Sequence, residues 1–355
     1  MFAKRRETMK ACFRGKGLFS LLLVSVLLLS AGPSALAAGG GEQLDMLVPA
    51  DPDEAFDPAA ARGYGANVEA MEALLGWTDL VQVAVSSGES NQFVLGLKKD
   101  GTVLAAGNDD FGQCQVGDWT DVIQISAGSG HAVGLKKDGT VLAAGDNMFG
   151  QCDVASMKGL RSVLAGNYFT AGIDASGNFV FAGYREYDPG TWYELGDYPV
   201  SWKDLRELAA RGDDLLCRTG DGTVLWFGFN GLMTDFQTNC RLADPGEKVT
   251  ALAVGGDYGM SFAVELQAGG RVKVLGDNSY GQARAEDWQN LRAVAAGGGH
   301  VAGLKKDGTV LAVGNDDCGQ CQVAGWTDVA SLAAGEHCTL GLTKEGKLLL
   351  AGCLF

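Results

Sequence analysis

The chain consists largely of an internal repeat, and this repeat limits its possible folds more than any other feature. The segment Gly96–Gly107 (GLKKDGTVLAAG) recurs unchanged at Gly134–Gly145 and, with valine at position 313, at Gly303–Gly314. Its central glycine returns at Gly101, Gly139, Gly177, Gly222, Gly270, Gly308 and Gly346. Successive glycines are 38 residues apart, except for spacings of 45 and 48 that mark two insertions. Periods of this length are typical of solenoids and propellers.

Each repeat has the features of short β-strands joined by a tight turn. The pairs Asp100-Gly101 and Asp138-Gly139 suit the positive φ angles of a two-residue type I′ hairpin. Apolar and β-branched runs flank them, as at residues 122–125 and 140–143, and a weaker fourth run follows at 113–116. The sequence therefore predicts four strands in each repeat.

Composition agrees with an all-β fold. Glycine accounts for 53 of the 355 residues, about twice its usual ~7%, without the period of collagen, which points to many turns and excludes a helical bundle. Four short strands in each of seven repeats predict a seven-bladed β-propeller of four-stranded blades over residues 77–355, because radial packing leaves only short sheet edges. An open β-solenoid is the alternative.

The ends of the repeat array predict how the ring closes. The last copy stops at Phe355 without its fourth-strand segment. In other copies a glycine precedes a tryptophan by 12 residues, as Gly107 precedes Trp119, and Gly65 precedes Trp77 by the same distance. We therefore expect residues 63–76 to close the ring, with residues 69–75 completing the last blade.

The N-terminus has the pattern of a secretory signal peptide. Basic residues precede the apolar run 18–29, and Ala35-Leu36-Ala37 forms a small-x-small cleavage site. The apolar run is too short for a spanning helix, which disfavours the alternative of a membrane anchor. We expect residues 1–37 to be removed, residues 38–62 to form an acidic, proline-containing linker, and the mature protein to be secreted, free of the membrane or associated with the cell surface.

The charge of the mature chain excludes one class of partner. The sequence has 28 basic and 43 acidic residues, and residues 1–37 hold six of the former and one of the latter, so the mature net charge is −20. Such a surface repels nucleic acid. The acidity either provides solubility alone or attracts a basic protein surface.

Several motifs of the repeat resemble those of a known family. Trp119-Thr-Asp-Val, Asp138-Gly139-Thr-Val-Leu-Ala and Gly145-Asp-Asn-x-x-Gly-Gln151 are similar to the repeat of the regulator of chromosome condensation family, and the resemblance covers residues 77–355. It implies a seven-bladed propeller. The founding member is a nuclear guanine-nucleotide exchange factor that touches chromatin, but no motif here carries its exchange residues, and the signal peptide and charge fit neither role.

Short secreted propellers of this class also resemble bacterial inhibitors that cap a β-lactamase with one face of the ring. The contact residues of those inhibitors lie in variable loops, so none is transferred to this chain. The sequence contains no Asn-x-Ser/Thr glycosylation site, which favours a bacterial exporter.

The residues that most often carry chemistry follow the repeat. His131 and His300 share a position that other copies fill with Phe93, Phe169, Asp214, Phe262 and Cys338, which indicates packing. Cys114, Cys152 and Cys321 share another position, where small buried residues are expected. The spacing of Cys318 and Cys321 has no second pair to complete a zinc site, and the Asx-rich turns have no bidentate Glu for calcium. We therefore predict no catalytic residue, metal or cofactor, and leave open the disulfide status of the eight mature cysteines.

The first insertion is the strongest candidate for recognition. Ten of the 30 aromatic residues fall within positions 184–236. Tyrosine and tryptophan in loops give large contact areas at a low entropic cost. Tyr184, Tyr187, Trp192, Tyr193 and Tyr198 therefore form either a binding loop or a loop packed on its own blade. We expect a secreted, non-catalytic, protein-binding propeller; the alternatives are an enzyme inhibitor, a carbohydrate-binding propeller, or a glycan-active enzyme in the axial channel.

Overall fold

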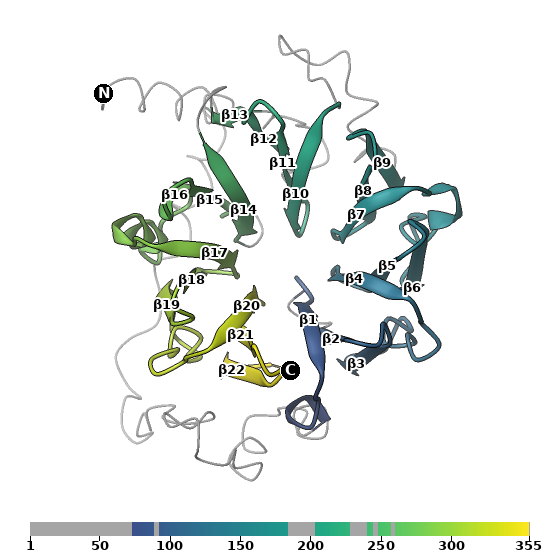
Figure 1. The fold of residues 1–355 in the computed structure, drawn as a ribbon, viewed down its shortest axis with the longest axis horizontal. Coiled ribbons are helices and arrows are strands. Elements are labelled where there is room, and N and C mark those ends of the chain that lie inside the picture. The colour runs from purple at the N-terminus through teal and green to yellow at the C-terminus, as the bar shows by residue number, and fades with distance from the viewer. Residues whose placement is uncertain are drawn as a thin grey trace, which may run out of the picture.

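Seven antiparallel sheets form a ring around a central axis in the computed structural model (Figure 1). The structure describes residues 73–88, 92–183, 203–227, 240–243, 248–256 and 260–354, and for the range 240–243 it describes the backbone only. The predicted signal peptide, the linker, most of the ring-closing segment and the aromatic insertion lie outside the described residues. We call the sheets blades 1 to 7 in chain order.

Each blade is a meander that runs outward from the axis. The strands are β1 (Leu80–Val85), β2 (Phe93–Lys98) and β3 (Val103–Gly107) in blade 1; β4 (Val122–Ala127), β5 (His131–Lys136) and β6 (Val141–Gly145) in blade 2; β7 (Leu160–Ala165), β8 (Phe169–Asp174) and β9 (Phe179–Gly183) in blade 3; β10 (Leu205–Arg211), β11 (Asp214–Thr219), β12 (Val224–Phe227) and β13 (Cys240–Ala243) in blade 4; β14 (Val249–Gly255), β15 (Phe262–Gln267) and β16 (Arg271–Gly276) in blade 5; β17 (Leu291–Ala296), β18 (His300–Lys305) and β19 (Val310–Gly314) in blade 6; and β20 (Val329–Ala334), β21 (Cys338–Thr343) and β22 (Leu348–Gly352) in blade 7. Two short 3-10 helices, η2 (Val154–Ser156) and η5 (Gln282–Asp287), lie between blades.

The prediction of a fourth strand is wrong for most of the blades that can be compared. Residues 113–116 and their equivalents at 151–154, 282–285 and 320–323 form turns or 3-10 helix, and only blade 4 has a fourth strand among the described residues. The reason is local. The Asp109 carboxylate accepts the Cys114 N–H (2.7 Å), so a backbone donor that a strand would use in a ladder is taken by a side chain.

The hairpin turns also differ from the prediction. The Lys98 carbonyl accepts the Gly101 N–H (3.0 Å), and the Lys98 N–H donates to the Thr102 carbonyl (2.9 Å). These two bonds define a three-residue loop. Gly101 has a φ of 85°, whereas Asp100 is not left-handed. The turn is therefore a type I turn followed by a left-handed glycine, and not type I′. Asp100 accepts both the N–H and the hydroxyl of Thr102, which explains the Asp-Gly-Thr motif.

Hydrogen bonds at these turns tie each blade to the next. The Gly101 carbonyl of blade 1 accepts the N–H of Val122, the first residue of β4 (3.1 Å), and the same bond joins Gly139 to Leu160 (3.0 Å) and Gly308 to Val329 (3.0 Å). We call this side of the ring, where the seven hairpin turns lie, the turn face.

The hydrophobic core lies between blades. Both faces of a middle strand are buried, and neighbouring residues serve different interfaces: Val94 packs toward blade 7, whereas Leu95 packs toward blade 2. Trp119 fills part of the interface between blades 1 and 2 and rests on Gly134. A Cβ atom on Gly134 would lie 2.8 Å from the Trp119 ring, so this contact requires glycine.

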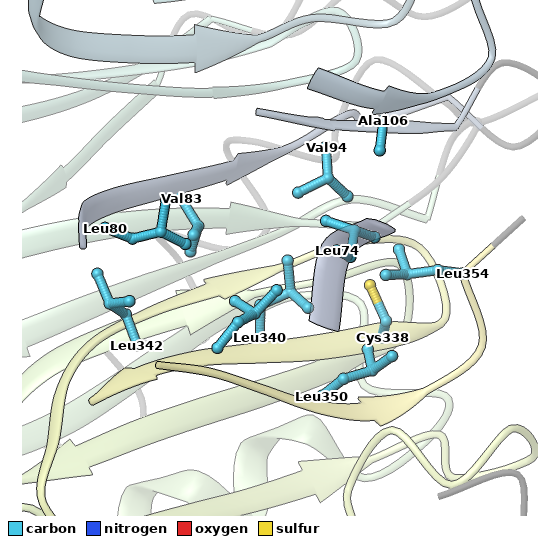
Figure 2. Packing of buried hydrophobic residues seen from close by; sticks show 11 residues of the cluster. Leu74, Leu80, Val83, Val94, Ala106, Cys338, Leu340, Leu342, Leu350 and Leu354 are labelled. Atoms are coloured by element: carbon cyan, nitrogen blue, oxygen red, sulfur yellow. The ribbon is translucent and has the colours of Figure 1, made fainter. Parts of the chain in front are cut away.

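The last interface joins blade 7 to blade 1 and uses side chains from both ends of the described chain (Figure 2). Strand β1 contacts β20 and β21. Leu74, in a helical turn before β1, has 1% of its surface exposed and packs with Cys338, Leu340 and Leu354 of blade 7. This described part of the predicted closing segment is therefore helical and not a strand.

Leu74→Ala tests how much this contact stabilises the ring. Truncating a fully buried leucine costs about 2–5 kcal/mol, because apolar contact is lost and a cavity remains. Leu75→Ala is the matched control, since 43% of Leu75 is exposed. We expect urea unfolding to show a marked loss for Leu74→Ala and almost none for Leu75→Ala; equal stability of the two variants would show that Leu74 does not hold the seam.

Candidate functional site

The side of the ring opposite the turn face carries two sets of loops. The loop after the first strand and the loop after the third strand emerge together, because the start of the middle strand pairs with the end of both, as Phe93 pairs with Gly107 and Val94 with Val85. We call this side the acidic face. Its described loops include residues 108–115, 128–130, 146–153, 166–168, 212–213, 277–284, 297–299, 315–322 and 335–337.

The carboxylates of the acidic face are bound by neutral groups. Asp146 accepts the Met148 N–H (2.9 Å) and the Gln151 amide (3.0 Å), and Asp316 accepts the Cys321 N–H (2.7 Å). No ion pair within the described part of the chain neutralises the following carboxylates: Asp109, Asp110, Asp146, Asp153, Asp277, Asp316 and Asp317.

The turn face differs in its electrostatics. Its carboxylates include ones paired with cations, as in Lys98–Asp100 (3.9 Å), Arg206–Asp204 (2.6 Å) and Lys344–Asp328 (3.0 Å). At its axial end Arg292 donates to the Val329 carbonyl of the next blade (2.7 Å). Among the described residues, ion pairs therefore involve carboxylates of the turn face but none of the seven carboxylates named above on the acidic face.

Large apolar side chains stand among these carboxylates. Met148 is 79% exposed, and Phe111 and Tyr280 are 48% and 45% exposed. Each aromatic ring leans over a loop of the next blade: Phe111 lies against Gly130 and Tyr280 against Gly299. The Phe149 ring meets the Tyr168 ring at 4.9 Å in an edge-on arrangement. The acidic face therefore combines negative charge with exposed apolar surface.

Buried glutamines hold these side chains in place. The Gln113 side chain is fully buried; it accepts the Phe111 N–H (2.9 Å) and donates to the Asn108 side chain (2.8 Å). The same pair of bonds joins Gln151 to Phe149 and Asp146, Gln282 to Tyr280 and Asp277, and Gln320 to Cys318 and Asn315. The loop motif thus fixes the backbone of an exposed residue before any partner binds, which lowers the entropic cost of association.

The two histidines that share a repeat position are buried hydrogen-bonding groups. The Thr170 hydroxyl of blade 3 donates to the Gln151 carbonyl (2.7 Å), so it must accept from the His131 Nε2–H of blade 2 (3.0 Å). His300 and Thr339 repeat this bond between blades 6 and 7 (2.9 Å). Burial lowers the pKa of His131 to about 4 and that of His300 to about 3. Both rings are neutral at pH 7 and link adjacent blades.

An ion pair crosses the axis at the acidic face. Arg211 at the end of β10 bonds to Glu336, which follows β20, and both side chains are buried. These strands belong to blades 4 and 7, on different sides of the ring (Figure 1). Arg211 also donates to the Gly256 carbonyl of blade 5 (3.1 Å). The pair therefore joins blades that are not neighbours in the ring.

Sequence reasoning missed this pair although the repeat contains its signal. Arg211 occupies the place of a glycine that follows Ala127, Ala165, Ala296 and Ala334 in other copies. Glu336 likewise stands where other copies have Ser129, Asn167 and Gly298. The added Glu336 side chain needs Gly298 beside it, since a Cβ there would overlap the carboxylate.

The predicted recognition residues Tyr184, Tyr187, Trp192, Tyr193 and Tyr198 lie outside the described residues. Their segment follows Gly183, the last residue of β9, which pairs with Phe169 at the acidic face. The seven turn glycines have φ angles between 81° and 93°.

The cysteines at the shared repeat position are half-buried and not fully buried as expected. The Cys114 thiol lies 3.2 Å from the Asn108 carbonyl, and burial raises its pKa to about 11. Within the described ranges no group of three or more His, Cys, Asp or Glu residues is arranged to hold a metal. In the same ranges no helix has the length and apolar character needed to cross a bilayer.

Comparison with known proteins agrees with this architecture. Residues 122–151 and 291–320 match the family model of the regulator of chromosome condensation (RCC1) repeat, so the chain carries RCC1 repeats. No curated protein matches the chain.

Solved structures show a similar fold at low sequence identity. The CRINKLY WD40 ectodomain of the receptor kinase ACR4 from Arabidopsis thaliana has a TM-score of 0.56 and 20% identity, covering 79% of this chain and 99% of that one. Human WBSCR16 has a TM-score of 0.56 and 17% identity, covering 75% and 88%. Prp20p from Saccharomyces cerevisiae, studied for its binding to Gsp1p and histones, has a TM-score of 0.53 and 15% identity, covering 77% and 82%. These similarities establish the fold alone.

Acid should destabilise the protein through its buried histidines. Because their folded pKa values lie below the unfolded value of about 6.5, the unfolded chain binds protons that the folded chain excludes. Their stabilising contribution is complete above about pH 6.5 and is lost as the pH falls toward 4. We expect His131→Phe/His300→Phe, which installs the residue found at Phe93, to reduce the fall in thermal midpoint between pH 7 and 4.5.

Asp213 titrates in the opposite sense, so wild type and variant must be compared at each pH. Burial raises the pKa of its carboxyl to about 6, and its contribution is therefore present below about pH 4 and lost as the pH rises through 6. This term is common to both proteins and cancels in their difference. The same pH profile for wild type and the double variant would contradict the role given to the histidines.

Proposed function

We propose that the chain is a secreted, non-catalytic propeller that binds a protein partner on its acidic face. The observation that carries this proposal is the combination of carboxylates outside any described ion pair with exposed apolar side chains, among which Phe111 and Tyr280 have their backbone N–H groups bound by buried glutamines. Exposed aromatic and methionine side chains on a fixed backbone are typical of binding hot spots.

The charge of the face specifies the chemistry of the partner. Carboxylates such as Asp109, Asp110, Asp316 and Asp317 favour a surface rich in lysine or arginine, and the aliphatic stems of those residues suit contact with Phe111 and Tyr280. The same charge disfavours nucleic acid. Arg211 and Glu336 neutralise each other at the axial end, which supports binding rather than catalysis at this site.

The aromatic insertion extends this proposal. Its segment leaves the described structure at Gly183 on the acidic face, in the same blade as Tyr168. Tyr184, Tyr187, Trp192, Tyr193 and Tyr198 would add to the apolar contact area there. A signal peptide at residues 1–37 supports secretion, after which residues 38–355 would act outside the cell, free or at its surface.

Binding experiments with matched variants test the proposal. Partners are first captured from surface and culture extracts, and their affinities are then measured. We expect Met148→Ala and Tyr280→Ala to weaken binding by about 2 kcal/mol each, as hot-spot truncations do. Val81→Ala and Ile123→Ala are the controls. These residues are also more than half exposed, but they lie near the start of the inner strands β1 and β4, at the end away from the acidic face.

Charge and insertion need separate variants. Asp316→Asn/Asp317→Asn keeps the side-chain shape and should weaken binding at low salt and reduce its salt dependence. Shortening the 184–198 segment to the regular repeat length tests the insertion. Equal binding by all variants and wild type would refute the acidic face as the site. Binding to a glycan array that depends on Tyr280 but not on Asp316 and Asp317 would instead favour carbohydrate recognition.

A further inference from the structure

Two cysteines replace residues that the repeat otherwise keeps. Cys318 occupies the exposed position that holds Phe111, Phe149 and Tyr280 in other loops. Cys353 directly follows the third strand of blade 7, where the other loops have Asn108, Asp146, Asp277 and Asn315. Cys114, Cys152 and Cys321, in contrast, share one regular position.

The fold brings these two positions together at every comparable interface. Phe111 and Asp146 both lie against Gly130, at the boundary of blades 1 and 2. Tyr280 and Asn315 both lie against Gly299, at the boundary of blades 5 and 6. The same two positions at the boundary of blades 6 and 7 are those of Cys318 and Cys353.

The contacts of Cys353 agree with this placement. Its N–H donates to the His337 carbonyl (2.9 Å), as the N–H of Asn315 donates to Gly299 (2.9 Å). Its Sγ atom lies 3.8 Å from the carbonyl oxygen of Cys318. Burial, together with the adjacent Cys318 thiol, raises the pKa of the Cys353 thiol to about 12.

Other cysteines are less suited to pair with Cys353. The Cys321 thiol donates to the Asn315 carbonyl of its own loop (3.3 Å). Cys338 is buried in the seam between blades 7 and 1, out of reach of a soluble oxidant. Cys318 and Cys353 are both half-buried, so a small thiol reagent has access to them.

We propose that Cys318 and Cys353 form a disulfide bond that ties the C-terminal residues to the loop after β19. In this reaction the two thiols lose their protons, an Sγ–Sγ bond forms, and the electron pair and protons pass to a disulfide oxidant. With oxidised glutathione as that oxidant, its S–S bond breaks and two glutathione thiols are released. Such a bond persists in the oxidising environment that a secreted protein meets.

The bond would staple the last blade into the ring. Residues 318 and 353 bracket β20, β21 and β22, so the covalent loop encloses the whole of blade 7. Leu354, the next residue, is buried in the seam with Leu74. A fixed C-terminus therefore supports the interface where the ring closes.

Mass spectrometry of the oxidised protein tests the pairing directly. The purified full-length chain is treated with oxidised glutathione or with dithiothreitol, alkylated, digested and fragmented. We expect a linked peptide pair joining Cys318 to Cys353 only after oxidation. Because the thiolate is the reacting form and the Cys353 pKa is high, the bond should form faster as the pH rises from 7 to 9.

Variants provide the matched controls and a second measurement. Cys318→Ser and Cys353→Ser should abolish the linked pair, whereas Cys321→Ser should retain it. The oxidised wild type should melt about 5 °C above the reduced form, and this difference should vanish in Cys353→Ser. Full alkylation of Cys318 and Cys353 after oxidation, or a link from Cys353 to Cys321 or Cys338, would overturn the proposal. Both readings concern the isolated chain, so they are independent of partner binding.

Discussion

Each blade of this protein has two apolar faces and cannot bury either of them alone. The middle strand β2 shows this most directly, since Val94 and Leu95 point to opposite neighbours and both are buried. A closed ring gives every blade a neighbour on each face, and its stability depends on contacts that cross from one repeat to the next. Close packing of Trp119 on Gly134 sets how near two such units can approach.

At the rim, polar side chains bind the backbone N–H groups that a neighbouring strand would otherwise bind. In the loops that leave the third strand, Gln113 and its equivalents bind the backbone internally, and the Asx residues accept further N–H groups. These bonds satisfy the loop without a ladder, so the outer edge of the blade ends early. The same loop leaves three consecutive residues exposed, Asp109, Asp110 and Phe111, so the rim that replaces a fourth strand is also the surface on which we propose that a partner binds.

Periodicity in the sequence was sufficient to predict seven blades, because a repeat with a hairpin at its centre leaves few arrangements for its apolar faces. It was not sufficient for the turn type, since Asp-Gly fits both a type I′ turn and a type I turn with a following glycine, and only the hydrogen bonds of Lys98 separate them. The prediction of a fourth strand was wrong because residues 113–116 alternate in polarity like a strand, whereas the Asp109 carboxylate, several residues away, accepts the Cys114 N–H.

The site was less predictable than the fold. Arg211 and Glu336 depart from the repeat only one residue at a time, whereas the exposed aromatics follow it, and the meaning of both sets depends on which loops share a face. Cys318 and Cys353 are far apart in the sequence, but the fold brings them into contact at the boundary of blades 6 and 7.

The bond between Arg211 and Glu336 has a mechanical consequence. A ring held only by contacts between neighbours can change from round to oval at little cost, because each interface needs to shift only slightly. A tie between blades 4 and 7 resists that distortion, since any change in the distance between them strains a buried ion pair, whose rupture would leave an uncompensated charge. The ion pair between blades 4 and 7 thus helps to fix the shape of the ring. The spacing of the loops on the acidic face depends on this ion pair as well as on the contacts between neighbouring blades.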